Sequence, residues 1–331
     1  MILTTRIRKR EKLAIFRCIR GNGGRAQPVY AGMNSVFPPA LVALAVATSA
    51  CVVNVDSQAQ VVREEKRFTV AGKPDLRLAT FDGSIEIRSW DRPDVLVEVE
   101  KRGATKEAVD ALEIRTSQQG DRIDLEVKSP RSETFSGIGF HVGASAKLIV
   151  SVPARADIQA RSGDGSISIE RVNGRLELRT GDGSIRAAEV SGELVMNTGD
   201  GSITVNGAEG TLDLDTGDGG VNVTGRLTGV RLHTGDGSIV YRAEPESRMA
   251  SNWEMTTGDG SVTLYLPTNF NAELDAHTGD GSISNELSVA NADSGDAERE
   301  RRRRTLRGRL GDGGREIRIR TGDGAIRLRQ S

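Results

Sequence analysis

The chain has 331 residues and is almost neutral, with 45 Lys and Arg against 46 Asp and Glu. Only 4% of its residues are aromatic while 39 are Gly, which indicates a thin aliphatic core with many turns rather than a broad globular core. The two cysteines, Cys18 and Cys51, both lie in the first part of the chain, which excludes a disulfide or a cysteine-based metal site in the rest of it.

The first fifty residues have the pattern of a secretory leader. Eight Lys and Arg between Arg6 and Arg25 precede an apolar run at residues 40–47, which is too short for a membrane span of about 20 residues. Without these eight residues and Glu11, the chain keeps 37 basic and 45 acidic residues, a net charge of −8. An acidic body argues against nucleic acid as a partner.

Two cleavage sites fit this leader. Thr48-Ser-Ala-Cys51 is similar to a bacterial lipoprotein box in which Cys51 would be lipidated, although Thr48 stands where Leu is usual. The alternative is cleavage after Ala59, and Met33 is an alternative start that would remove the basic residues. We predict that residues 1–51 are a signal or lipoprotein leader, with a mature start at residue 60 as the alternative. The protein is then exported to the bacterial cell envelope, as a periplasmic or outer-membrane protein.

Residues 60–152 are expected to form an N-terminal β part with a capping helix. Predicted strands cover residues 67–70, 76–78, 95–100, 112–116 and 122–127. Phe81–Ile85 is a first, degenerate copy of a phrase that returns later. The helix is predicted at residues 105–112 with Thr105 as its N-cap, where it would cover the open end of a stack of strands. The Ser- and Gly-rich residues 129–143 are predicted to loop out.

The phrase S/T-G-D-G-S-I, with close variants, then returns at a period of 18. It places acidic side chains at Asp164, Asp182, Asp200, Asp218 and Asp236. Looser copies follow at residues 257–262, 278–283 and 321–326. A fixed period of this kind indicates stacked supersecondary units, each too small to bury its own apolar face.

Each unit contains two short runs with alternating aliphatic residues, such as Ile167/Ile169 and Leu176/Leu178. Alternation at period 2 predicts strands. Stacking would place Ile167, Ile185 and Ile203 in one ladder at a strand spacing of about 4.8 Å. We therefore predict an all-β fold, a single-chain β-solenoid (β-helix) with coils of about 18 residues over residues 153–331 and one short helix near the N-terminal end. An antiparallel sandwich or barrel is the alternative.

Gly-Asp-Gly forms the corner between units, where Gly would allow a positive φ. The extra residues at 243–250 are expected in a turn, and residues 291–309 as a solvated charged loop, with an anionic-surface contact as the alternative. The last strands carry outward arginines and would form a basic final edge that discourages end-to-end growth. They are Arg318, Arg320, Arg327 and Arg329.

The corner Asp residues raise the question of a metal. Stacked carboxylates about 4.8 Å apart repel by roughly 0.9 kcal/mol per pair even in water. We expect each Asp to accept backbone N–H groups of its own turn. Weak Ca²⁺ binding by Asp164, Asp182, Asp200, Asp218 and Asp236 is the alternative, but one carboxylate per corner offers few of the six to eight oxygens that Ca²⁺ takes. No cofactor is predicted.

No catalytic residue set is visible in the sequence. His141, His233 and His277 are scattered, and no Ser/His/Asp or zinc motif occurs. Trp90, Trp253, Tyr241 and Tyr265 are too dispersed for an aromatic glycan platform. A β-helix glycan lyase or hydrolase remains the enzymatic alternative, which a groove holding outward acids and Arg would favour.

The corner phrases, the Leu148–Pro153 run and the closing G-D-G-G-R-E-I-R-I-R-T-G-D-G-A-I-R-L together resemble the bacterial "putative adhesin" family of β-solenoid domains over residues 65–329. The resemblance implies an exported or envelope-anchored β-solenoid and brings no catalytic residue. The sequence thus predicts a non-enzymatic adhesin or interaction scaffold. Its partner would be an unknown surface ligand or envelope protein, and it would meet the membrane through a lipid on Cys51.

Overall fold

A computed structural model describes residues 60–129, 144–290 and 304–331. The chain divides into two units, Met1–Asn54 and Val55–Ser331, and every described residue belongs to the second. The leader with Cys51, the loop predicted at 129–143 beyond its first residue, and His141 lie outside the described residues. In the described part of the chain, no helix is both long and apolar enough to cross a membrane.

The N-terminal part contains seven strands and one short helix. These are β1 (Gln60–Phe68), β2 (Asp75–Thr80), β3 (Ile85–Trp90), β4 (Val95–Gly103), α1 (Lys106–Asp110), β5 (Glu113–Gln119), β6 (Arg122–Lys128) and β7 (Ala144–Pro153). The predicted N-cap is confirmed, since the Thr105 hydroxyl accepts a hydrogen bond from the Ala108 amide at 3.2 Å.

The regular repeats follow, and their strands coincide with the predicted alternating runs. They are β8 (Asp157–Ser162), β9 (Ile167–Glu170), β10 (Asn173–Thr180), β11 (Ile185–Ala188), β12 (Ser191–Thr198), β13 (Ile203–Thr216), β14 (Val221–Thr234) and β15 (Ile239–Ala243). Of the predicted insertion at 243–250, residues 244–250 lie in the connection that follows β15, and Ala243 is the last residue of that strand.

The C-terminal part completes an all-β fold. Its strands are β16 (Trp253–Thr257), β17 (Val262–Leu266), β18 (Ala272–Thr278), β19 (Ile283–Asn285), β20 (Val289–Ala290), β21 (Thr305–Leu310), β22 (Glu316–Thr321) and β23 (Ile326–Gln330). The prediction of a loop over residues 291–309 is wrong for its last part. Residues 305–309 belong to β21, which pairs antiparallel with β18 and β20.

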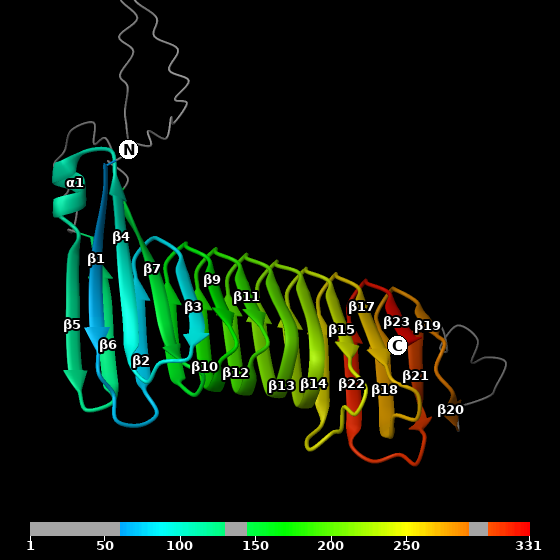
Figure 1. Ribbon diagram of the computed structural model, residues 1–331. Helices are drawn as coiled ribbons and strands as arrows, with labels where there is room; N and C mark the ends of the chain where they lie inside the picture. The colour runs from blue at the N-terminus through cyan, green and yellow to red at the C-terminus, as the bar shows by residue number, and fades with distance from the viewer. Residues whose placement is uncertain (1–59, 130–143, 291–303) are drawn as a thin grey trace, which may run out of the picture. The chain divides into compact units, whose positions relative to one another are not determined.

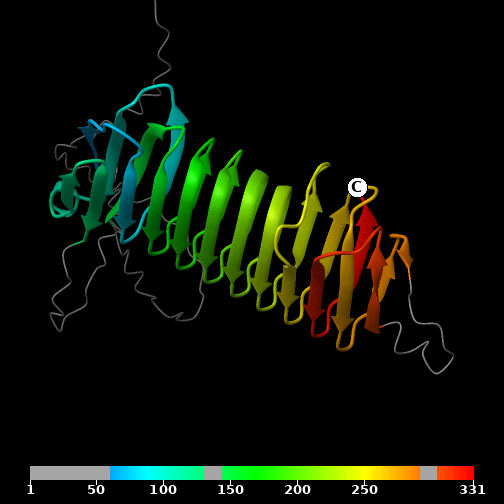
Figure 2. The ribbon, with the colours of Figure 1, turned by 90° about the horizontal axis from the view of Figure 1, so that it is seen from below.

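Equivalent residues of successive repeats pair in parallel and in register. Ile185 lies opposite Ile167 on one side and Ile203 on the other, as the 18-residue period predicts. The first strand of each repeat pairs with first strands and the second with second strands, which gives two rows along the stack (Figures 1 and 2). The first row contains β9, β11 and β15, the second contains β10, β12 and β16, and the long β13 and β14 contribute to both.

The buried side chains between the rows are mainly aliphatic, as predicted. The exception is a buried aromatic cluster in the C-terminal half. Trp253 packs edge-on against Tyr241 at 5.3 Å between ring centroids and against Phe270 at 5.1 Å. Tyr241 continues the column of Val223, and Trp253 continues that of Val230, so the larger rings occupy positions filled by smaller residues in earlier repeats.

The corner glycines serve a different purpose from the one predicted. From Gly163 to Gly324, no glycine of an S/T-G-D-G corner has a φ in the left-handed region, whereas Gly311 and Gly313, in the turn before β22, have φ values of 54° and 80°. A Cβ on the second Gly of a corner would instead overlap the carbonyl oxygen of its counterpart one repeat away, as for Gly183 against Gly165. Close stacking of the repeats, rather than turn conformation, therefore requires Gly at these positions.

The hydrogen bonding of the corners also differs from the prediction. None of the corner Asp carboxylates accepts a hydrogen bond from a described backbone amide. A hydroxyl does so instead, since the amide of Gly237 donates to Thr234 Oγ1 at 3.2 Å. The same hydroxyl donates to the carbonyl of Gly219 in the previous repeat at 2.9 Å, so the buried Thr column joins each corner to the next.

The spatial order of the last coils departs from the chain order. β22 pairs in parallel with β16 on one side and with β18 on the other. β23 lies in the same way between β17 and β19. The C-terminal coil, Glu316–Gln330, is therefore inserted between two coils that are consecutive in the chain. The prediction that its arginines form a basic final edge is wrong, because this coil is flanked on both sides.

The N-terminal end of the stack is formed by strands that precede the regular repeats in the chain. β2 and β3 pair with β8 and β9 of the regular repeats, which confirms that the phrase at Phe81–Ile85 belongs to the stack. Beyond them, β4, β5, β6 and β7 extend the two rows, and the antiparallel β1 pairs with β4. Helix α1 buries Val109 beside these strands, so strands form most of this end and the helix only supplements them.

Candidate functional site: the outer face of the second row

One column of outward side chains crosses the second row of strands from β6 to β21. From the N-terminal to the C-terminal end, neighbouring strands place in this column Asp124, Arg77, Gln159, Glu177, Val195, Asp213, Arg231, Glu254, Arg318, Asp275 and Arg307. The last six members alternate strictly between acid and base. Opposite charges on neighbouring strands stabilise a sheet by roughly 0.2–1 kcal/mol per pair, whereas like charges destabilise it.

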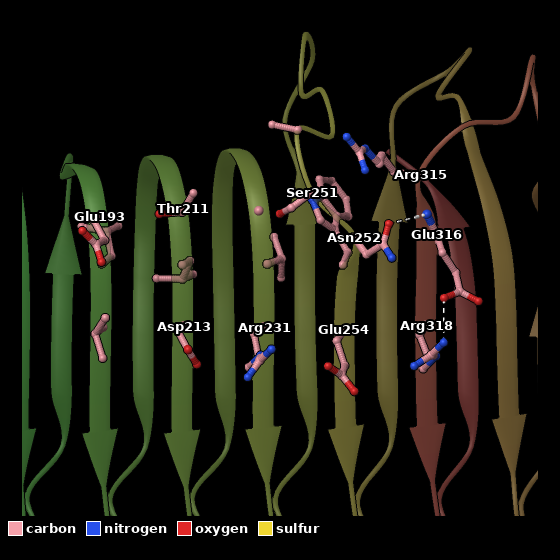
Figure 3. Close-up of a pocket in the computed structure, with 17 residues that line it drawn as sticks. Glu193, Thr211, Asp213, Arg231, Ser251, Asn252, Glu254, Arg315, Glu316 and Arg318 are labelled. Atoms are coloured by element: carbon pink, nitrogen blue, oxygen red, sulfur yellow. Dashed lines mark hydrogen bonds and ion pairs between the residues drawn. The ribbon is translucent and has the colours of Figure 1, made fainter.

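A groove of about 690 Å³ lies over the middle of this column (Figure 3). Asp213, Arg231 and Glu254 point outward from three successive strands along it, and Arg318 extends the series to the fourth. Strands are about 4.8 Å apart, so the groove presents charges of alternating sign at that interval. A surface of this kind favours a ligand that both accepts and donates hydrogen bonds over one with a uniform charge.

The rim of the groove is formed where the 18-residue period breaks. The longer connection after β15 brings Ser251 and Asn252 to the groove, and Arg315 approaches from the turn before β22 (Figure 3). The Asn252 side-chain carbonyl accepts a hydrogen bond from the Glu316 amide at 3.1 Å, which ties this connection to the C-terminal coil. Arg318 donates to the Glu316 carboxylate at 2.8 Å.

A second hollow of about 660 Å³ shares Arg315 with the groove as a lining residue. It is lined by residues of three irregular connections, namely 245–249, 267–271 and 313–315. Two non-glycine residues there, Glu246 and Asn269, have positive φ values of 70° and 63°. The departures from the repeat thus gather at the C-terminal half of the second row.

The outer face of the first row has a different character. The column beside its first buried residues contains mostly uncharged polar groups, namely Glu86, Ser168, Arg186, Thr204, Asn222, Val240, Thr263, Arg327 and Ser284. Of these two columns, only the one on the second row carries charges that alternate regularly in sign. We take the second-row face as the candidate site for that reason.

Two acids of the charged column are held ionised by their neighbours. The pKa of the Glu177 carboxyl is lowered, first by a hydrogen bond from Gln159 at 2.8 Å and further by Arg179 and Arg161, against the effect of partial burial. Burial is the largest influence on Asp275 and would raise its pKa, but hydrogen bonds from Arg320 at 2.5 Å and Arg307 at 3.0 Å outweigh it and lower the pKa.

The predicted metal candidates lie away from the groove. All corner Asp side chains are exposed and form a single ridge along the stack. In spatial order the ridge contains Asp82, Asp164, Asp182, Asp200, Asp218, Asp236, Asp259, Asp323 and Asp280. Asp280 forms an ion pair with Arg304 at 3.1 Å. Among the described residues, no three His, Cys, Asp or Glu side chains are grouped as a metal site would require.

The other residues considered from the sequence do not come together. His233 and His277 are exposed, and His277 Nδ1 lies 2.8 Å from the Thr305 hydroxyl. Trp253 and Tyr241 are core residues and offer no surface platform. Trp90 and Tyr265 are partly buried, and each carries an arginine, Arg92 or Arg242, over its ring.

The sequence did not single out Arg231 or Glu254, and it assigned Arg318 to a basic final edge rather than to this face. The 18-residue spacing of Asp213 and Arg231 is visible in the sequence, but the alternation of charge is not, because it depends on the spatial order of the last coils.

Comparison with known proteins gives a family and several matching solved structures. The family model for Toastrack DUF4097 matches residues 75–329. No curated protein matches the chain. A putative cell adhesion protein from Clostridium sporogenes is 13% identical, with 82% of this chain and 100% of that chain covered and a TM-score of 0.26.

Two further solved structures are similar. A putative adhesin from Bacteroides fragilis is 10% identical over 81% of this chain and 97% of its own, with a TM-score of 0.38. A putative lipid binding protein from Parabacteroides distasonis is 14% identical over 80% of this chain and 96% of its own, with a TM-score of 0.41. No ligand of this chain is inferred from these likenesses. The family match covers most of the chain and agrees with the resemblance drawn from its repeats: the chain belongs to the Toastrack DUF4097 family.

Proposed function

We propose that this protein is a non-enzymatic, exported cell-envelope protein, a β-solenoid scaffold with coils of about 18 residues that binds a surface ligand or envelope protein. The observation that carries this proposal is the alternating charged column with its groove on the second row. In-register stacking holds Asp213, Arg231, Glu254 and Arg318 on neighbouring strands. Such a surface loses little side-chain and backbone freedom when a partner binds.

A binding experiment with matched variants tests the role of this face. The probe is the envelope fraction of the producing bacterium lacking its own copy of the gene, and the readout is saturable co-sedimentation of the purified protein. Arg231→Glu with Arg318→Glu should weaken binding about tenfold or more, which corresponds to about 1.4 kcal/mol. Thr204→Glu with Asn222→Glu, on the outer face of the first row, should leave binding unchanged. Equal losses in both pairs, or no saturable binding by the unaltered protein, would contradict the proposal.

Export and anchoring need a separate test. We infer from the leader that Cys51 is lipidated after cleavage, and a palmitate analogue supplied to expressing cells should label the protein. The Cys51→Ala variant is the control. Label that persists in this variant would refute the anchor, whereas an unlabelled protein beginning at residue 60 would support cleavage after Ala59.

A glycan lyase or hydrolase is the second candidate function, since the groove does contain acids and Arg. Asp213 and Glu254 flank Arg231, so each of these acids faces a guanidinium on a neighbouring strand. Product release from acidic and neutral polysaccharides, abolished by Glu254→Gln, would establish the enzyme and displace the scaffold.

A further inference from the structure

The C-terminal coil, Glu316–Gln330, occupies a slot rather than an end of the stack. One wall of the slot is β16 and β17, and the other is β18 and β19. The two walls are joined by only five residues, 267–271, yet the coil that separates them comes from the end of the chain. Figure 1 shows β22 and β23 between strands that precede them in the sequence.

The corners of the three coils stack without a gap. The Gly322 amide donates to the Gly258 carbonyl at 2.6 Å on one side of the slot. On the other side, the Asp280 amide donates to the Gly322 carbonyl at 2.9 Å. The bond to Gly258 repeats the one between regular corners, such as Gly181 to Gly163. On the other wall the pattern is shifted, since the Gly279 amide donates to the Thr321 carbonyl at 3.1 Å.

The charges of the coil complement those of the slot. The coil carries four arginines and two acids, Glu316 and the corner Asp323; the arginines are Arg318, Arg320, Arg327 and Arg329. Acids stand on or beside the walls, namely Glu254 on β16, Glu273 and Asp275 on β18, and Glu286 after β19. Arg320 binds Asp275 at 2.5 Å, and Arg329 forms an ion pair with Glu286. Without the coil, Glu254 and Asp275 would be the facing members of the two walls.

We propose that this coil is an exchangeable element through which two copies of the chain associate, each inserting residues 316–330 into the slot of the other. Every contact between coil and slot is the same whether the coil comes from the same chain or from a second copy. Exchange of an identical element is therefore a low-cost route to a dimer.

The recognition mode is strand addition, in which main-chain hydrogen bonds provide affinity and side chains provide register. Here the register is specified by charge, because Arg318 must lie between Glu254 and Asp275 to avoid facing acids.

Disulfide trapping between two full-length single-cysteine variants tests the exchange. Both carry Cys18→Ser and Cys51→Ser. One then has Thr263→Cys on β17 and the other Arg327→Cys on β23, residues that are cross-strand partners on the outer face of the first row. The control is Thr204→Cys mixed with Asn222→Cys, which are cross-strand partners in the same column of the regular repeats and have matching exposure.

The two variants of each pair are mixed at high concentration, incubated and mildly oxidised, and the products are separated on a non-reducing gel. We expect the Thr263→Cys/Arg327→Cys mixture to give a disulfide-linked heterodimer at about tenfold the yield of the control mixture. Equal yields from the two mixtures would overturn the proposal. So would a double variant, Thr263→Cys with Arg327→Cys in one chain, that closes only intramolecular disulfides at every protein concentration.

Discussion

Gly201 lies so close to the carbonyl oxygen of Gly183, one repeat earlier in the chain, that a Cβ on Gly201 would overlap this oxygen. The same relationship recurs from corner to corner, for instance between Gly219 and Gly201. Backbone atoms on both sides cannot move apart without lengthening the hydrogen bonds of the neighbouring strands. The repeated Gly is therefore a condition of the stacking distance.

Gly201→Ala should destabilise the protein by on the order of 3 kcal/mol, because overpacking against backbone cannot be relieved by a rotamer change. Gly220→Ala is the matched control. Gly220 stands in the position of the corner Ser, and a Cβ there would lie 3.7 Å from the nearest atom, an ordinary contact. The free energy of unfolding from urea titration distinguishes the two. A loss at Gly201 no larger than at Gly220 would refute the steric explanation.

The buried Thr column should contribute stability through its hydroxyls. Thr216 Oγ1 lies 2.9 Å from the Gly201 carbonyl and 3.2 Å from that of Gly199. Thr216→Val keeps the shape of the side chain but leaves buried acceptors without their donor, which costs about 1–3 kcal/mol. Thr211→Val, at an exposed position of the same strand, should change the free energy of unfolding by less than about 0.5 kcal/mol. Similar values for both variants would argue against the hydroxyl ladder.

Asp275 should make the stability of the C-terminal coils depend on pH. Its folded-state pKa is lowered by Arg320 and Arg307 in spite of burial, and Arg318 lies opposite it in the register. A lowered folded pKa means that its stabilisation is present above the unfolded value of about 3.9 and is lost as the pH falls through the folded pKa.

Asp275→Asn should therefore cost on the order of 2 kcal/mol at neutral pH, where it removes charge-assisted hydrogen bonds, and little at strongly acidic pH. Urea unfolding of both proteins across this range gives the comparison, with the exposed Asp215→Asn as the control. A difference that stays constant with pH would show that the carboxylate charge is not the cause.

The exposed Asp ridge should be under repulsive strain at low salt. Asp200 lies between Asp182 and Asp218, and each neighbour repels it by roughly 0.9 kcal/mol at the strand spacing. Asp200→Asn should raise the melting temperature at low ionic strength and less at high ionic strength, where the charges are screened. Thermal unfolding at two NaCl concentrations measures this.

Calcium provides the complementary measurement. We expect equal melting temperatures in EDTA and in millimolar Ca²⁺ once ionic strength is matched, because one carboxylate per corner falls short of the oxygens that Ca²⁺ takes. A rise in Ca²⁺ that Asp200→Asn reduces would instead establish the corners as calcium sites.

Much of the strand arrangement could be predicted from the sequence. The pairing of Ile167, Ile185 and Ile203 follows from the period, because like residues in register bury one face of every strand. The Thr105 N-cap was equally visible. The role of Gly in the corners was not visible in the sequence. Gly is the residue that suits both a turn with positive φ and a corner with close backbone stacking, so its presence does not distinguish the two.

The candidate site could be predicted only in part. The spacing of Asp213 and Arg231 predicts neighbours on one face, but nothing local indicates that Arg318 lies between Glu254 and Asp275. Nor does the sequence show that a strand late in the chain, such as β22, lies between other strands rather than at the edge of the stack.

The sequence by itself determined the repeat length, the alternation that turns aliphatic side chains inward, and the small residues that let one corner lie on another. Only the tertiary structure decided which coil lies beside which at the C-terminal end. The physical reason is that the corners are nearly identical, so backbone hydrogen bonding allows any coil to stack on any other. The observed order of the C-terminal coils brings together residues that are distant in the chain. Asp275, for example, accepts hydrogen bonds from Arg307 and Arg320.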